Sequence, residues 1–307
     1  MSRIHPHSPG VRSPVKVAFI AGSSYSGSTL LGLILGAAPH IVYVGELNQY
    51  RRAAWRSRPS SIGHVLCSCG LTYDRCPFWT RVFSSLPCGE DLNPSPGFSL
   101  ANLRPLLAAL LGRPPRRRLD TEYGALARTV QEIGGRPSAE TTWVVDSSKS
   151  LGALDELATS EGVDVRVIHL LRDAGSVAGS FKKRGRSALY GMAAWAIGNA
   201  ALRAYISRRR IRCLGVEYAD LCEPGEALCR IHAFIGSEEP PGDPVAAMRG
   251  RTYHLMGGSR NVRPTAGRLP FREIRRRVDD ERLNRLERLV ARNLFSPLER
   301  FLLRGAR

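Results

Sequence analysis

The chain has 307 residues, of which 43% are hydrophobic, enough to bury the core of one large α/β domain or two average domains. Its 45 Lys and Arg outnumber 27 Asp and Glu, and the formal net charge of +18 attracts anions without distinguishing nucleotides, acidic glycans, nucleic acid and anionic lipid. No apolar run reaches the roughly 18 residues of a membrane span, no signal-type segment is evident, and the seven cysteines are odd in number, so we expect a cytoplasmic protein with reduced thiols.

An α/β pattern begins after a polar segment, 1–14, which we expect to be flexible. The short apolar and β-branched run Val15–Ala21 is typical of a strand buried on both faces. A Gly and Ser loop follows, and then an apolar helix is expected at 29–38 and a second strand at 40–44. Strand, loop, helix and strand in this order open a parallel α/β sheet.

Residues 51–140 break this pattern with scattered prolines, clustered cysteines and a basic turn at 113–118. We interpret them as a mostly helical and loop insertion that forms the acceptor side. The pattern then resumes, with strands expected at 143–145, 165–171 and 211–216, and helices at 151–160, 174–184, 188–208 and 279–303, the last broken near Pro297. The sequence therefore predicts one α/β domain over 15–307, a three-layer, P-loop-type parallel sheet flanked by helices.

The loop at 22–29 is a candidate phosphate-binding loop. Gly22 and Gly27 let the backbone turn so that successive N–H groups point at an anion, and the helix N-terminus adds its positive end. A nucleoside-triphosphate hydrolase would carry Lys at position 28, where this chain has Ser28, and a Mg²⁺ carboxylate, for which Asp146 is a candidate. The alternative is a Gly/Ser turn that merely joins strand to helix.

A second anion site is suggested by Arg172 and Ser180. Arg172 ends a predicted strand, and Ser180 follows eight residues later, about two turns into the next helix. One guanidinium and one hydroxyl placed in this way can hold a phosphate remote from the loop. Taken alone, an Arg at a strand end is more often a salt-bridge partner.

Together, the loop and the Arg172–Ser180 spacing resemble the bacterial, carbohydrate- and tyrosyl-protein-like sulfotransferases that use 3′-phosphoadenosine 5′-phosphosulfate (PAPS). The resemblance implies that Arg172 and Ser180 bind the 3′-phosphate, that 3′,5′-adenosine bisphosphate is the product, and that no metal takes part. Weaker matches at Tyr218 and in the late segment 254–260 imply further contacts with the nucleotide. The implied nucleotide-binding residues are Ser24, Tyr25, Ser26, Gly27, Ser28, Thr29, Leu30, Arg172, Ser180, Tyr218, His254 and Arg260.

Glu46 and Lys149 are the predicted catalytic residues. Glu46 resembles an acidic residue placed after the second strand in this family, which would take the proton from an acceptor hydroxyl. An ion pair at a strand end is the alternative. The family commonly has Lys or Arg where this chain has Tyr25, so charge on the bridging oxygen must be stabilised by another group, for which Lys149 is the first candidate and Arg260 the second.

His169 and His254 are rival candidates for the base. His169 alternates within an apolar predicted strand, so its position favours a core residue.

The sequence thus predicts a sulfotransferase that moves a sulfuryl group from PAPS to a hydroxyl of a small-molecule, glycan or lipid acceptor. The alternatives are a P-loop kinase or NTPase, a nucleic-acid-binding protein, and a PAPS-binding relative that has lost catalysis, which Tyr25 leaves open. Aromatic residues make up only 7% and no reading motif is present, so we expect no specific nucleic-acid partner. The basic clusters 113–118 and 272–277 are either solvated faces or surfaces for an acidic acceptor or an anionic membrane.

The cysteines Cys67, Cys69 and Cys76 form the most unusual local composition. A zinc site needs four ligands, usually from Cys-x2-Cys pairs, and this spacing offers three, with Cys88 or His64 as the fourth. We therefore favour a packed or disulfide-linked loop. Similar segments ending in Cys-Pro-Phe-Trp occur in bacterial relatives of the resembled family, which implies a structural element.

Overall fold

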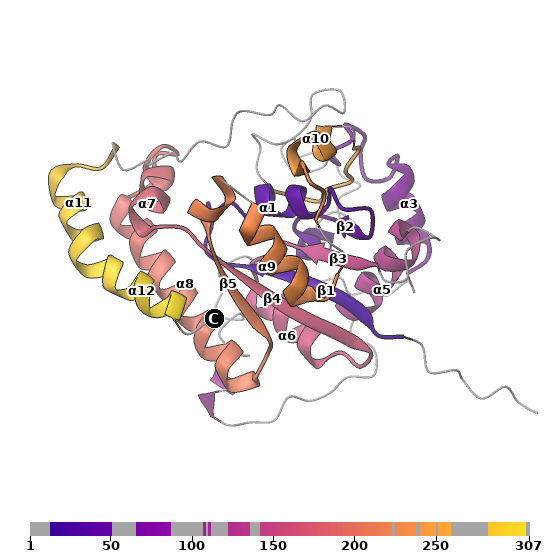
Figure 1. Ribbon diagram of the computed structural model, residues 1–307, viewed down its shortest axis with the longest axis horizontal. Coiled ribbons are helices and arrows are strands. Elements are labelled where there is room, and N and C mark those ends of the chain that lie inside the picture. The colour runs from indigo at the N-terminus through magenta and orange to yellow at the C-terminus, as the bar shows by residue number, and fades with distance from the viewer. Residues whose placement is uncertain are drawn as a thin grey trace, which may run out of the picture.

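A five-stranded sheet lies at the centre of the protein in the computed structural model. The structure describes residues 13–50, 66–86, 107–108, 110–111, 122–135, 142–222, 225–237, 240–249, 251–258 and 282–304. All five strands are parallel and follow the order β2-β3-β1-β4-β5 (Figure 1). They are β1 (Val15–Ala21), β2 (Ile41–Tyr43), β3 (Trp143–Asp146), β4 (Val163–Leu171) and β5 (Cys213–Glu217). The predicted α/β class with a parallel sheet is therefore confirmed.

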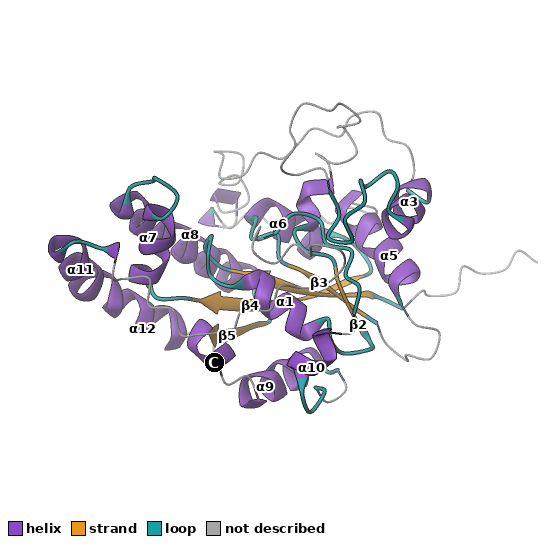
Figure 2. Ribbon diagram, turned by 90° about the horizontal axis from the view of Figure 1, so that it is seen from above, coloured by secondary structure: helices purple, strands orange, loops and turns teal. Residues whose placement is uncertain are grey.

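Helices cover both faces of this sheet (Figure 2). One face packs against α5 (Glu122–Gly134), α6 (Leu151–Thr159) and α8 (Ala188–Arg209), and the other against α1 (Ser28–Leu35), α9 (Gly225–Ile235) and α10 (Pro244–Arg249). The remaining elements are α3 (Pro77–Ser84), α7 (Ala174–Lys182), α11 (Arg285–Val290), the π-helical turn η6 (Ala291–Phe295), α12 (Ser296–Arg304), and the 3₁₀ turns η1 (Leu47–Gln49) and η3 (Tyr218–Cys222). Helices, sheet and helices make the three layers that were predicted.

Strand β1 shows why the sheet is buried on both faces. Its side chains alternate, so Val17 and Phe19 join the core under α5 and α6, whereas Ala18 and Ile20 join the core under α1 and α9. None of these four residues is exposed by more than 1%. A continuous apolar run of this kind requires cover on both sides, which is the physical basis of the sequence prediction.

Most predicted elements after residue 140 lie within a few residues of the observed ones. The predicted helix 279–303 is an exception: the described residues form α11, a π turn and α12, and the π turn ends just before Pro297. Helix α5, inside the predicted insertion 51–140, packs Leu126 and Val130 into the core beneath the sheet. The predicted segments 1–14, 113–118 and 272–277 lie wholly or almost wholly outside the described residues.

Within the described part of the chain, the helices are too short or too polar to cross a lipid bilayer.

Candidate functional site

The candidate site lies at the carboxyl ends of the strands. The predicted phosphate loop follows β1, Glu46 follows β2, Lys149 follows β3, Arg172 follows β4, and Tyr218 follows β5. Because all five strands are parallel, these residues meet at one edge of the sheet. Open α/β sheets bind ligands at this edge.

The phosphate loop, residues 22–29, leads from the end of β1 into the first turn of α1. Gly22 has φ +149°, and a Cβ there would lie 2.4 Å from the carbonyl oxygen of Leu170 on β4. Gly27 is the N-cap of α1 with φ +95°, and a Cβ there would lie 2.4 Å from the ring of Tyr218. Both positions therefore require glycine for space as well as for backbone conformation. The predicted strand–loop–helix geometry is present.

Three residues with hydroxyl groups lie in the loop and in the first turn of α1. The side chains of Ser26, Ser28 and Thr29 are buried. The Ser26 hydroxyl has no hydrogen-bond partner among the described residues. Buried hydroxyls without a partner are uncommon, and an anionic ligand at the helix N-terminus would provide an acceptor for it.

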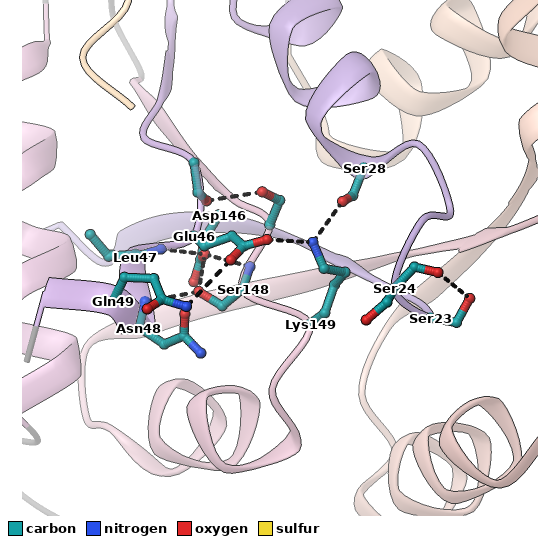
Figure 3. A network of polar contacts seen from close by, with 12 residues as sticks. Ser23, Ser24, Ser28, Glu46, Leu47, Asn48, Gln49, Asp146, Ser148 and Lys149 are labelled. Atoms are coloured by element: carbon teal, nitrogen blue, oxygen red, sulfur yellow. Dashed lines mark hydrogen bonds and ion pairs between the residues drawn. The ribbon is translucent and has the colours of Figure 1, made fainter. Parts of the chain in front are cut away.

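Lys149 supplies the positive charge that the loop lacks. Its ammonium nitrogen lies 3.0 Å from Ser28 Oγ and 2.8 Å from Glu46 Oε1, so one side chain joins the loop to the carboxylate (Figure 3). Lys149 has the left-handed backbone value φ +56°. Non-glycine residues seldom adopt this conformation, and such positions concentrate at functional sites. The two predicted catalytic residues are thus brought together.

Asp146 holds the backbone that carries these two residues. One oxygen of its fully buried carboxylate accepts hydrogen bonds from the backbone N–H groups of Leu47 and Ser148, and the other accepts from the Tyr123 hydroxyl at 2.6 Å. Burial is the main reason that the pKa of Asp146 is raised to about 6. Its oxygens are occupied by protein donors, so this carboxylate anchors β2 to β3, an arrangement unlike an open Mg²⁺ site.

Glu46 is held from several directions. Its backbone N–H donates to the carbonyl of Met256 at 2.6 Å, and its second carboxylate oxygen lies 3.4 Å from the Gln49 side-chain nitrogen. A Cβ on Gly257 would lie 3.2 Å from this same oxygen, and one on Gly258 would lie 3.5 Å from Thr29. Gly257 and Gly258 therefore lie beside Glu46 and the first turn of α1.

Arg172 lies on the other side of the loop. It donates a hydrogen bond of 3.0 Å to the carbonyl of Tyr25, and its guanidinium lies over the ring of Tyr218, 4.6 Å from the centroid. Tyr25 has φ +66°, so the Arg172 bond helps to hold a strained residue at the tip of the loop. Arg172, Tyr218, Tyr25 and Gly27 thus form one contact group.

The Tyr25 ring packs against α7 and the residues that follow it. It makes an edge-on contact with Phe181 at 5.0 Å and lies under Arg184 at 4.7 Å. Ser180 is on α7, where its hydroxyl donates to the carbonyl of Ser176 at 3.0 Å. A joint role of Arg172 and Ser180 on one phosphate stays a prediction.

The two rival histidines have different surroundings. His169 is fully buried, shares a hydrogen bond of 2.9 Å with Asn199, and has a pKa lowered to about 4 by burial, which confirms it as a core residue. His254 instead lies beside Cys67 and Cys76. Its contact with nucleotide stays a prediction, and Arg260 lies outside the described residues.

No protein-family model matches this sequence, and a search of curated proteins gave no significant match. Solved structures do resemble it. The sulfotransferase domain from the curacin biosynthetic pathway matches with 19% identity and a TM-score of 0.46, covering 80% of this chain and 81% of that domain. The sulfotransferase domain of the Synechococcus PCC 7002 olefin synthase matches with 20% identity and a TM-score of 0.41, covering 94% of this chain and 97% of that domain.

A third solved structure, sulfotransferase STF9 from Mycobacterium avium, has 14% identity and a TM-score of 0.38, with 77% of this chain and 68% of that one covered. All three structures are sulfotransferases. This is the family that the loop and the Arg172–Ser180 spacing resemble.

Three functional features were not evident from the sequence. Tyr123 supports Asp146 from α5, although its segment was interpreted as part of the insertion. Gly257 lies against Glu46 and Gly258 lies against Thr29, and the only sequence signal for this close approach was that the two glycines are consecutive. His254 meets cysteines that precede it by 178 residues or more, a proximity that no local pattern encodes.

Proposed function

We propose that this protein is a PAPS-dependent sulfotransferase acting on a hydroxyl of a small-molecule, glycan or lipid acceptor. The observation that carries the proposal is the position of Lys149, whose ammonium lies 3.0 Å from Ser28 in the phosphate loop and 2.8 Å from Glu46. One cation thus lies between the place for a phosphosulfate and a carboxylate that can accept a proton. The sequence pairing of the loop with Arg172 and Ser180 supports PAPS as the donor.

The loop amides at the α1 N-terminus, with Ser26, Ser28 and Thr29, would bind the 5′-phosphosulfate. The acceptor hydroxyl would attack sulfur in line, forming an O–S bond while the bond from sulfur to the bridging oxygen breaks. Glu46 would take the hydroxyl proton. Lys149 would stabilise the negative charge that develops on the bridging oxygen of the leaving bisphosphate.

Arg172 has a separate place in this proposal. It lies beyond the loop from Lys149, against Tyr25 and Tyr218, and would bind the 3′-phosphate together with Ser180. A guanidinium presents several donors in a fixed plane, which suits recognition of a phosphate. The Tyr218 ring would complete this side of the nucleotide site.

A thermal-shift titration tests the donor class. We expect 3′,5′-adenosine bisphosphate to stabilise the protein selectively, by about 2.7 kcal/mol at 100 times its Kd, compared with ADP, 5′-AMP and ATP with Mg²⁺. Stabilisation by ATP with Mg²⁺ instead would contradict the proposal and favour a kinase. Release of the bisphosphate from PAPS in the presence of hydroxyl acceptors then tests transfer, and selective binding without transfer would indicate a relative that has lost catalysis.

A further inference from the structure

Three cysteines and one histidine form a compact cluster outside the proposed catalytic site. The ligand atoms of Cys67, Cys69, Cys76 and His254 all lie within 4.8 Å of one another. Cys67 and Cys76 are fully buried and Cys69 is partly buried. The cluster joins two parts of the chain that are far apart in sequence, the cysteine loop 66–76 and residues 251–258.

The distances within this cluster match a tetrahedral zinc site. Zn–S bonds of about 2.3 Å and Zn–N bonds of about 2.0–2.1 Å place two sulfur ligands about 3.8 Å apart, and a sulfur and a nitrogen about 3.5 Å apart. The Sγ atoms of Cys67 and Cys76 are 3.6 Å apart, and His254 Nδ1 lies 3.2 Å from Cys76 Sγ and 3.7 Å from Cys67 Sγ. A disulfide would need sulfurs about 2.05 Å apart, so the cysteines are free thiols in a ligand-like arrangement.

The backbone of the cysteine loop arranges the thiols. The Cys67 N–H donates to the Leu71 carbonyl at 2.9 Å, and the Gly70 N–H donates to the Cys67 carbonyl at 3.0 Å, so the loop folds back on itself. Gly70 has φ +90°, and a Cβ there would meet nothing within 4 Å, so it is the turn conformation that favours glycine. Cys76 is the N-cap of α3, with Pro77 at the first position of the helix. The turn at Gly70 and the start of α3 thus bring the three thiols close together.

Side-chain contacts orient the fourth ligand. The ring of Phe78 stacks on the ring of His254, with centroids 5.3 Å apart and planes 8° from parallel. Ser68 Oγ donates to the carbonyl of Tyr253 at 2.5 Å and accepts from the N–H of Leu255 at 2.8 Å, which fixes both neighbours of His254. The imidazole of His254 is therefore held beside the thiols by packing against Phe78 and by the hydrogen bonds of its two neighbours in the chain.

We infer that Cys67, Cys69, Cys76 and His254 bind one Zn²⁺ ion in a closed structural site. Four protein ligands leave no open position, so the ion would have no part in sulfuryl transfer itself. This inference reverses the sequence-based preference for a packed or disulfide-linked loop. It also gives His254 the role of a metal ligand in place of the predicted contact with the nucleotide.

The proposed ion would hold in place the residues after His254, which contact Glu46. Met256 lies two residues after His254 and pairs with the backbone on both sides of Gly45, donating to Val44 at 2.8 Å and accepting from Glu46 at 2.6 Å. Gly257 then lies against the Glu46 carboxylate. Removal of the ion would therefore free a segment that positions Glu46.

The test is the metal content of the full chain, purified under reducing conditions and measured by elemental analysis. We expect about one zinc per chain. The variant Cys69→Ser should lose most of the zinc, and its partly exposed position favours retention of the fold. The control Cys229→Ser changes an exposed cysteine outside the cluster and should keep its full zinc content. Less than a tenth of an equivalent in protein supplied with Zn²⁺, or full content in Cys69→Ser, would overturn the inference.

Two further measurements test the ligand set, and the first needs no variant. Replacement of the ion by Co²⁺ in the wild-type chain should give the intense visible bands of a tetrahedral thiolate site, and His254→Cys should keep the metal as a four-cysteine site. A Cys67–Cys76 disulfide found by mass spectrometry, or iron in place of zinc, would contradict the assignment. These measurements read metal binding alone, so failure of the proposed sulfotransferase activity would leave their results unaffected.

Discussion

The two sides of the candidate site are built in different ways. The phosphate loop at 22–29 contains no charged residue, and it offers backbone amides, hydroxyls and a helix N-terminus within eight consecutive positions. The opposite side carries Glu46 and Lys149 from two different strand ends, held by the buried Asp146. The loop is thus formed by consecutive, uncharged residues, whereas the β2–β3 side is formed by charged residues that lie far apart in the sequence. Binding and charge stabilisation can therefore be separated by mutation.

The largest expected effect comes from the proton acceptor on the charged side. Glu46→Gln should lower kcat about 10²- to 10⁴-fold, because an amide cannot take the acceptor proton, while binding of the bisphosphate changes little. Steady-state kinetics and thermal shift measure the two quantities. Glu161→Gln is the control, since Glu161 is an exposed residue in the turn before β4, at the other end of the sheet. Normal turnover in Glu46→Gln would remove the proposed base.

The second largest effect is expected for Lys149→Met. Its kcat should be lowered about 10²- to 10³-fold, as is typical when one donor to a developing charge is removed. The loss should appear mainly in kcat, because the ground-state phosphosulfate keeps its contacts with the loop. Lys16→Met provides the control: Lys16 lies near the start of β1 and contacts the Trp143 ring. If Lys149→Met retained wild-type kcat, the neutral loop alone would be sufficient and the contrast between the two sides would fail.

Asp146 gives a pH test of the support beneath the charged side. Its pKa is raised from 3.8 to about 6 in the folded protein, so the folded state holds the proton more tightly than the unfolded state. The stability that Asp146 contributes relative to Asp146→Asn should therefore increase by about 2 kcal/mol as the pH falls from about 7 to about 4. Urea unfolding of both proteins across this range measures the difference. A difference that is constant with pH would contradict the raised pKa.

The smallest expected effect concerns the far side of the loop. Arg172→Ala should weaken binding of 3′,5′-adenosine bisphosphate by about 10- to 100-fold, because charge-assisted hydrogen bonds are lost, and should weaken 5′-AMP less. Calorimetric titration with both nucleotides gives the comparison. Arg212→Ala, which removes an exposed arginine paired with Asp164, should change neither. Equal losses for both nucleotides would mean that Arg172 supports the loop through Tyr25 and does not recognise a 3′-phosphate.

The same contrast explains what the sequence could predict. The strand β1, the loop and α1 were evident because apolar periodicity and glycine spacing are local signals. Lys149 was proposed from the charge missing at Tyr25, but its contacts with Ser28 and Glu46 span 121 and 103 residues and required the fold. Helix α5 buries Tyr123, Leu126 and Val130 at helical spacing, but its packing beneath the sheet joins segments far apart in the chain and required the fold. The proximity of His254 to Cys67 and Cys76 likewise spans 178 residues or more.

The strand order has a further consequence for the ligand. Lys149 follows β3 and Arg172 follows β4, and β1 lies between those strands. Neighbouring strands are about 4.8 Å apart, so the two cationic residues leave the sheet roughly 10 Å from each other. Under the proposed function, a nucleotide with phosphate at one end only would contact one of them. Simultaneous contact with both would require a donor whose two anionic groups are separated by a distance of this order, which corresponds to two strand spacings across β1.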